Sequence, residues 1–128
     1  MRRFAYERPR DLAEATRLLA EAGEGARVLA GGTDLVVGLR DDSIRPEVVV
    51  DIKWIAELGG ETISRSGGAL RFSALATMGQ IERDERVLAE LPALAEAARV
   101  VGSVQIRNRA TLAGNICNGS PAADTAPP

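Results

Sequence analysis

The stretch Gln105–Asp124, QIRNRATLAGNICNGSPAAD, decides how the rest of the chain is interpreted. It is rich in small residues, amides and hydroxyls, and it carries a single carboxylate, Asp124. Small side chains let the backbone approach a ligand closely, and free N–H and O–H groups can then donate hydrogen bonds to that ligand. This composition favours contact with an anion such as a phosphate.

A second segment of the same character lies upstream, where Gly31-Gly32-Thr33-Asp34 interrupts two apolar runs. Val28–Ala30 predicts a short buried strand, and Leu35–Arg40 predicts a helix. Such a turn can bring backbone amides and the positive end of a helix to a pyrophosphate. The segment is neither the three-glycine dinucleotide fingerprint nor a P-loop. Taken alone, it more often indicates a tight turn in which Thr33 or Asp34 caps a helix.

Composition excludes several classes of protein. Of the 128 residues, 27% are charged and 3% are aromatic, and the net charge is −2, so neither a basic field nor stacking platforms favour nucleic acid. The chain has no histidine, which excludes a zinc site or a Ser-His-Asp triad. Its one cysteine, Cys117, is expected to be a buried small residue. Without a signal peptide or an apolar run long enough for a membrane span, the sequence predicts a soluble, cytoplasmic protein.

Short strands and helices alternate along the chain, which predicts an α/β (α+β) fold. Apolar periodicity in the first half gives the order strand, helix, strand, helix, strand, and therefore a small parallel or mixed sheet covered by helices. The predicted strands and helices of this half are Arg3–Tyr6, Asp11–Ala22, Val28–Ala30, Leu35–Arg40 and Val48–Ile52.

The second half predicts a hairpin followed by helices. Thr62–Arg65 and Leu70–Ser73 flank a Ser-Gly-Gly turn, and helices are expected over Met78–Leu91 and Pro92–Val101. A change in composition near Leu58 divides the chain into lobes of residues 1–58 and 59–128. Arg107 and Arg109 are expected to pair with surface carboxylates or to contact a partner subunit, rather than to bind phosphate oxygens. A solvated helix face is expected to hold Gln80, Glu82, Arg83, Asp84, Glu85 and Arg86.

Taken together, the two small-residue segments resemble one family, the FAD-binding medium subunit of molybdenum hydroxylases. This is the group of xanthine dehydrogenase, carbon monoxide dehydrogenase and aldehyde dehydrogenase. The resemblance implies an FAD-binding fold of the PCMH type, with FAD as cofactor and the flavin diphosphate between two small α/β lobes of short mixed sheets. It extends from end to end of the chain and rests on Ala30–Leu35, Ser103–Ile116 and Ser120–Asp124, with further similarity at Phe4–Pro9, Val50–Ile52 and Ala74–Met78.

The resemblance also implies which residues hold FAD. Asp124 matches a residue that accepts hydrogen bonds from the sugar hydroxyls of the flavin, although a cap or an Asx-turn before Pro127 is the alternative. Ala113 stands where relatives usually have glycine, which matters only if its φ is positive. The full set of implied cofactor-binding residues is Val28, Leu29, Ala30, Gly31, Gly32, Thr33, Asp34, Leu35, Val101, Thr111, Gly114, Asn115 and Asp124.

The function implied by the resemblance is electron transfer within an oxidoreductase complex. A molybdopterin-binding large subunit and a 2Fe-2S small subunit are the implied partners, and NAD, a quinone or oxygen is the implied acceptor. The chain ends at Pro127-Pro128 where family members continue, so a second lobe truncated at its C-terminus is expected, inactive by itself. Two alternatives remain: a flavin-dependent oxidase acting directly on a small alcohol, disfavoured by the lack of histidine, and a truncated, non-catalytic interaction module.

Overall fold

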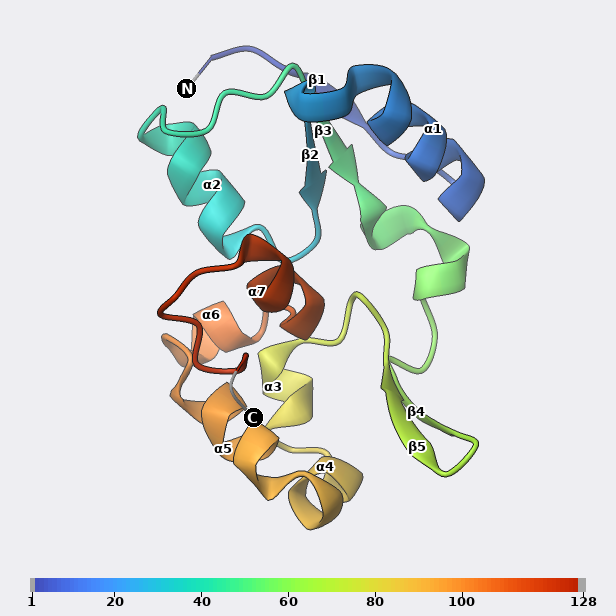
Figure 1. The fold of residues 1–128 in the computed structure, drawn as a ribbon, viewed down its shortest axis with the longest axis vertical. Helices are drawn as coiled ribbons and strands as arrows, with labels where there is room; N and C mark the ends of the chain where they lie inside the picture. Colours follow the sequence, from blue (N-terminus) through green and yellow to red (C-terminus); the bar gives the residue numbers. More distant parts are fainter. Residues whose placement is uncertain (1, 127–128) are drawn as a thin grey trace. The chain divides into compact units, whose positions relative to one another are not determined.

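The structure, a computed structural model, describes residues 2–126 and confirms the predicted α/β fold (Figure 1). The chain divides into two compact units, the first ending at Gly60 and the second beginning at Glu61. Each unit has its own sheet and its own apolar core. Pro127 and Pro128, on which the expectation of a truncated end rests, lie outside the described residues.

The first unit is built on a parallel sheet of three strands in the order β1-β3-β2. All four residues of the central strand β3 are buried, as expected of an apolar strand that is covered on both faces. The elements of this unit are β1 (Ala5–Glu7), α1 (Leu12–Ala22), β2 (Ala26–Leu29), α2 (Thr33–Arg40) and β3 (Val48–Asp51), with 3-10 turns at Gly23–Gly25, Ile52–Trp54 and Ala56–Leu58.

The two helices of the first unit cover opposite faces of its sheet, as Figure 1 shows. Ala15 of α1 packs in one core cluster with Val48 and Val50, whereas Leu35 of α2 packs in another with Val49. Successive side chains of a strand point to opposite faces, so the three consecutive valines of β3 serve both clusters. This packing fixes the position at which β2 turns into α2.

A buried carboxylate, Asp51, closes the end of β3. It accepts hydrogen bonds from the Tyr6 hydroxyl, from the Lys53 backbone N–H at 3.1 Å and from Lys53 Nζ at 2.6 Å. Burial by itself would raise the pKa of Asp51, but the Lys53 ammonium, the Tyr6 hydroxyl and the Lys53 backbone N–H together hold that pKa below its ordinary value. Asp51 therefore stabilises the fold in its ionised form.

We expect this carboxylate to make folding stability depend on acid pH. Because the pKa of Asp51 is lower in the folded chain, its contribution is complete above the unfolded pKa of about 3.9 and is lost as the pH falls through the folded value. Urea unfolding from about pH 7 to about pH 3 should show the advantage of the wild type over Asp51→Asn shrinking toward acid. An advantage that stays constant over this range would contradict the prediction.

The second unit combines a hairpin with five helices among the described residues. The antiparallel strands are β4 (Ile63–Ser66) and β5 (Ala69–Phe72). The short helices α3 and α4 pack on α5, whose buried Ala95 and Ala98 allow a close approach. The helices are α3 (Met78–Ile81), α4 (Glu85–Glu90), α5 (Pro92–Val100), α6 (Val104–Arg107) and α7 (Leu112–Asn118).

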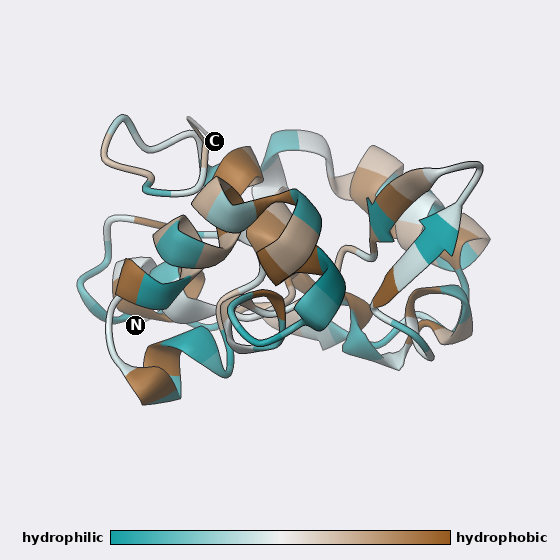
Figure 2. Cartoon of the chain, turned by 90° about the horizontal axis from the view of Figure 1, so that it is seen from below, coloured by the Kyte–Doolittle hydropathy of each residue, from teal (hydrophilic) through white to brown (hydrophobic). Residues whose placement is uncertain are grey.

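Each helix carries both apolar and polar residues, as Figure 2 shows, since only one face of a helix packs against the core. The core of the second unit is centred on Met78 and Ile81, which are both fully buried. In the described part of the chain, no helix combines the length and the apolar character that a membrane crossing requires.

Two sequence predictions for the stretch Met78–Leu91 are wrong. The helix expected over Met78–Leu91 is interrupted after Ile81, because the Asp84 side chain accepts hydrogen bonds from two backbone N–H groups and starts a new helix, α4. The charged face expected to be solvated is also partly buried, since the Glu82 side chain is only 9% exposed. Both errors concern charged side chains that interact with the chain itself rather than with water.

Candidate functional site

The first predicted segment joins β2 to α2 through Gly32, the N-cap residue of the helix. The first intrahelical hydrogen bond runs from the Val36 N–H to the Gly32 carbonyl at 2.9 Å. The N–H groups from Thr33 to Leu35 precede that bond, and no side chain caps them. An uncapped first turn of this kind offers backbone donors and a partial positive charge to an anion.

The alternative in which Thr33 or Asp34 caps this helix is wrong. Both residues lie within the first turn of α2, one and two positions after the N-cap. Asp34 is exposed, and its negative charge is favourable at a helix start because it interacts with the macrodipole. The donors of this turn are therefore left to water or to a ligand.

The backbone conformation at Gly32 favours glycine even without a ligand. Its φ is 76°, a left-handed conformation that side chains disfavour, and a Cβ there would lie 2.7 Å from Leu29 Cδ1. Leu29 and Leu35 both contribute side chains to the apolar core of this unit. Leu35 is buried, which leaves its backbone groups for a ligand, whereas Leu29 is partly buried and Val28 is 45% exposed.

The second predicted segment begins α7 at Thr111, a buried N-cap residue. Its hydroxyl oxygen accepts a hydrogen bond from the Gly114 N–H at 3.1 Å. A Cβ on Gly114 would lie only 2.8 Å from that same oxygen, so glycine allows the cap to close. Ala113 lies inside α7 and has no positive φ, so alanine brings no backbone strain at this position.

The backbone at Thr111 is held by an isolated antiparallel bridge to Thr77. Two hydrogen bonds, of 2.9 and 3.0 Å, join the backbone neighbours of one threonine to those of the other. Thr77 is itself the N-cap of α3, in a reciprocal capping box with Gln80. The start of α7 is thus fixed against the core of its unit.

An ion pair that the sequence does not reveal joins Glu82, the C-cap residue of α3, to Arg107 of α6. Arg107 Nε lies 3.1 Å from Glu82 Oε2, and the two side chains are only 13% and 9% exposed. Gly79 makes the approach possible, since a Cβ there would lie 2.7 Å from Asn108 Oδ1 and 3.3 Å from the carbonyl oxygen of Arg107. Arg107 therefore pairs with a carboxylate, as predicted, but the prediction that this carboxylate lies at the surface is wrong.

The end of the described chain folds back onto α7. Asn115 Oδ1 accepts a hydrogen bond from the Thr125 hydroxyl at 2.6 Å, and Thr125 is only 4% exposed. Asp124, its neighbour, is exposed, and within residues 2–126 its carboxylate accepts no hydrogen bond. A cap or Asx-turn at Asp124 thus has no support among these residues, and Pro127 lies outside them.

Two other residues are placed as follows. Val101 is partly buried against the core of the second unit, and its carbonyl oxygen accepts a hydrogen bond from Arg107 Nη1 at 3.4 Å. Cys117 is exposed on α7, so the expectation that it is buried is wrong. The preceding residue, Ile116, is also exposed, so the core covers only one face of α7.

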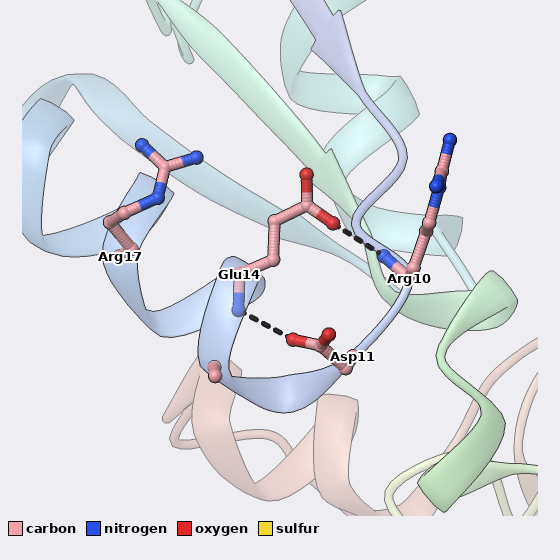
Figure 3. Close-up of a pocket in the computed structure, with 5 residues that line it drawn as sticks. Arg10, Asp11, Glu14 and Arg17 are labelled. Atoms are coloured by element: carbon pink, nitrogen blue, oxygen red, sulfur yellow. Dashed lines mark hydrogen bonds between the residues drawn. The ribbon is translucent and has the colours of Figure 1, made fainter.

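A shallow depression at the start of α1 is lined by none of the predicted residues (Figure 3). Asp11 accepts a hydrogen bond from the Glu14 N–H at 2.8 Å, and Glu14 Oε2 accepts one from the Arg10 N–H at 2.8 Å. Arg17 is paired with Glu21 at 2.8 Å. These contacts cap and stabilise α1, so the polar side chains that line the depression serve the helix itself.

Comparisons with known proteins identify the family of the chain. Residues 2–128 match the family described as the FAD binding domain in molybdopterin dehydrogenase. The xanthine dehydrogenase FAD-binding subunit of Escherichia coli O157:H7 is 43% identical over 124 residues, 97% of this chain and 42% of that protein. The carbon monoxide dehydrogenase medium chain of Hydrogenophaga pseudoflava is 37% identical over 122 residues, 95% of this chain and 42% of that protein.

A solved structure has the same fold. Carbon monoxide dehydrogenase from Hydrogenophaga pseudoflava, in a form lacking the Mo-pyranopterin moiety of the molybdenum cofactor, matches with a TM-score of 0.90 and 36% identity. The match covers 97% of this chain and 42% of that one.

An uncapped helix start after paired glycines offers backbone donors of the kind that can bind a diphosphate. The chain belongs to the family of FAD-binding domains found in molybdopterin dehydrogenases. The predicted family, fold class and cofactor, FAD, are confirmed. The chain spans 42% of the length of the curated relatives reported above.

Proposed function

We propose that this chain holds FAD as the electron-transfer component of a molybdenum-containing dehydrogenase. The observation that supports it most strongly is the family match over residues 2–128, together with the uncapped first turn of α2. When bound, FAD would supply the redox chemistry, taking electrons from a 2Fe-2S small subunit and delivering them to an acceptor such as NAD, a quinone or oxygen. The substrate would be oxidised on a molybdopterin-binding large subunit.

The first segment would bind the diphosphate through its backbone. In this proposal the N–H groups from Gly31 to Leu35 donate hydrogen bonds to phosphate oxygens, and the Thr33 hydroxyl adds another donor. The backbone of Val28–Ala30 would line the cofactor beside them. Because α2 has no side-chain cap, binding displaces only water from these donors.

The second segment would hold the rest of the cofactor. Thr111, Gly114 and Asn115 are proposed as polar contacts at the start of α7, and Val101 as an apolar one. The exposed carboxylate of Asp124 would accept hydrogen bonds from sugar hydroxyls, as acidic residues do in dinucleotide sites. None of these residues is proposed to be catalytic, because the chain would only hold FAD in position for the electron transfer of the complex.

The substrate of such a complex follows from its other subunits. The relatives named above are subunits of xanthine dehydrogenase and of carbon monoxide dehydrogenase, so no single substrate is proposed. A cytoplasmic location stays a prediction from the sequence.

The experiment that tests the proposal is a flavin titration. The purified chain, freed of flavin, is titrated with FAD and in parallel with FMN, and quenching of flavin fluorescence gives each dissociation constant. We expect FAD to bind at least about tenfold more tightly, because a diphosphate can accept hydrogen bonds from more donors than a monophosphate.

Two results would contradict the proposal in different ways. Equal affinity for FMN and FAD would show that the diphosphate does not contribute to binding. Bleaching of the bound flavin by a small alcohol, with no partner subunit present, would identify the chain instead as a flavin-dependent oxidase.

A further inference from the structure

We infer that Thr125 is a positioning residue that orients the Asn115 side chain toward FAD, an inference that rests on the proposed function. Thr125 is 4% exposed, and its hydroxyl donates to Asn115 Oδ1 at 2.6 Å. Asn115 lies on α7, one helical turn after Thr111, and is partly buried. The two side chains belong to parts of the chain ten residues apart, so neither helix geometry nor sequence proximity enforces their contact.

The chemistry of the amide gives this contact its consequence. A carboxamide has an oxygen that only accepts and a nitrogen that only donates, and a rotation of the terminal torsion exchanges the two ends. The Thr125 hydroxyl needs an acceptor because it is buried, and Asn115 Oδ1 is the acceptor it has among residues 2–126. With the oxygen engaged, the nitrogen of Asn115 is the end left for a ligand.

A flavin diphosphate requires a hydrogen-bond donor, and the nitrogen is the donor end of the Asn115 amide. Phosphate oxygens accept hydrogen bonds and donate none at neutral pH, so an Asn115 oxygen facing them would repel rather than bind. The Thr125 hydrogen bond thus selects the productive one of two side-chain orientations that are otherwise close in energy. Thr125 itself acts only through Asn115 and is no ligand of the cofactor.

The same hydrogen bond fixes the position of Asp124. Between α7 and Thr125 the chain forms a turn, in which the Ala123 N–H donates to the Ser120 carbonyl at 3.0 Å. The turn and the buried threonine hold the intervening residues in one conformation. One contact therefore positions two residues that are proposed to bind FAD.

The test compares two substitutions of Thr125. Thr125→Val keeps the shape of the side chain and removes the hydroxyl, whereas Thr125→Ser keeps the hydroxyl and removes a buried methyl group. We expect Thr125→Val to weaken FAD binding about threefold to tenfold, and Thr125→Ser to bind within about twofold of the wild type. A role in packing alone predicts the opposite order, because only serine loses apolar contact. The inference would be overturned if Thr125→Val bound FAD as tightly as the wild type, or if Thr125→Ser bound FAD no more tightly than Thr125→Val.

Variants of Asn115 separate this inference from the proposed function. Asn115→Asp can still accept from Thr125 but offers the ligand no donor, so it should bind FAD more weakly than Asn115→Ala. In the Asn115→Ala background, Thr125→Val should cause no further loss of affinity. If Asn115→Ala binds FAD like the wild type, the proposed contact itself fails. If Asn115→Ala binds weakly while Thr125→Val does not, only the positioning role fails.

Folding is measured on the same variants by thermal unfolding without flavin, so that a loss of stability is not mistaken for a loss of affinity. The Asn115→Asp comparison needs no change at the buried position 125. It would overturn the inference by itself if aspartate were accepted as well as asparagine, since the oxygen would then be the end that faces FAD.

Discussion

Replacing Glu82 by glutamine is expected to lower the free energy of unfolding by about 3 kcal/mol. The Glu82 carboxylate lies 3.1 Å from Arg107 Nε, and only 9% and 13% of the two side chains are exposed. Without the negative charge, the Arg107 guanidinium stays buried with no counter-charge beside it. The amide oxygen of glutamine can still accept one hydrogen bond, which places the loss at the low end for a broken buried pair.

A matched control comes from an exposed ion pair of the same unit. Arg65 and Glu90 are paired, but their side chains are 46% and 44% exposed. Glu90→Gln makes the same chemical change where water screens the charges, so we expect it to alter stability by less than about 1 kcal/mol. Urea unfolding of both variants gives the comparison. Equal losses would show that the burial of the Glu82 pair does not determine its contribution.

The Glu82 variant should also bind FAD less tightly. Arg107 is followed within four residues by Thr111, and the ion pair holds that part of the chain against α3. A shift of Arg107 would therefore move the start of α7 and the contacts proposed there. Glu90 lies in α4, outside this path, so its variant should keep the affinity of the wild type.

Much of the fold follows from local pattern in the sequence. The buried valines of β3 and the Gly67-Gly68 turn of the hairpin are visible as an apolar run and a paired-glycine break. The helix break before α4 is not, because Asp84 lies in a charged run that a continuous helix would also tolerate. Only the hydrogen bonds from its carboxylate to the backbone reveal it as a cap.

The candidate site, like the fold, is only partly predictable from the sequence. Small residues mark both proposed segments in the sequence, as a close approach to a ligand would require. The contacts that hold these segments in place join residues far apart in the chain, such as Thr77 with Thr111 and Glu82 with Arg107. No local pattern encodes such a pair. Composition therefore indicates where a ligand binds, whereas the support behind the site becomes visible only in three dimensions.

The second large effect is expected at Asp124, whose replacement by alanine should weaken FAD binding about tenfold to a hundredfold. A hydrogen bond from a sugar hydroxyl to a carboxylate is charge-assisted and contributes roughly 1.5–3 kcal/mol. The exposed carboxylate has no hydrogen bond within residues 2–126, so its removal should leave the free energy of unfolding nearly unchanged. Flavin titration and urea unfolding of the same variant measure the two quantities.

A surface carboxylate of the same unit provides the control for charge. Glu96 on α5 is exposed, and Glu96→Ala removes one negative charge without touching either predicted segment. If Asp124 acted only through the net charge of the domain, both variants would bind the anionic cofactor slightly more tightly. A specific hydrogen bond predicts a large loss for Asp124→Ala alone and an intermediate loss for Asp124→Asn, which keeps one acceptor but not the charge. Asp124→Ala binding FAD like Glu96→Ala would remove Asp124 from the site, because a carboxylate that accepts from sugar hydroxyls cannot be deleted without a loss of affinity.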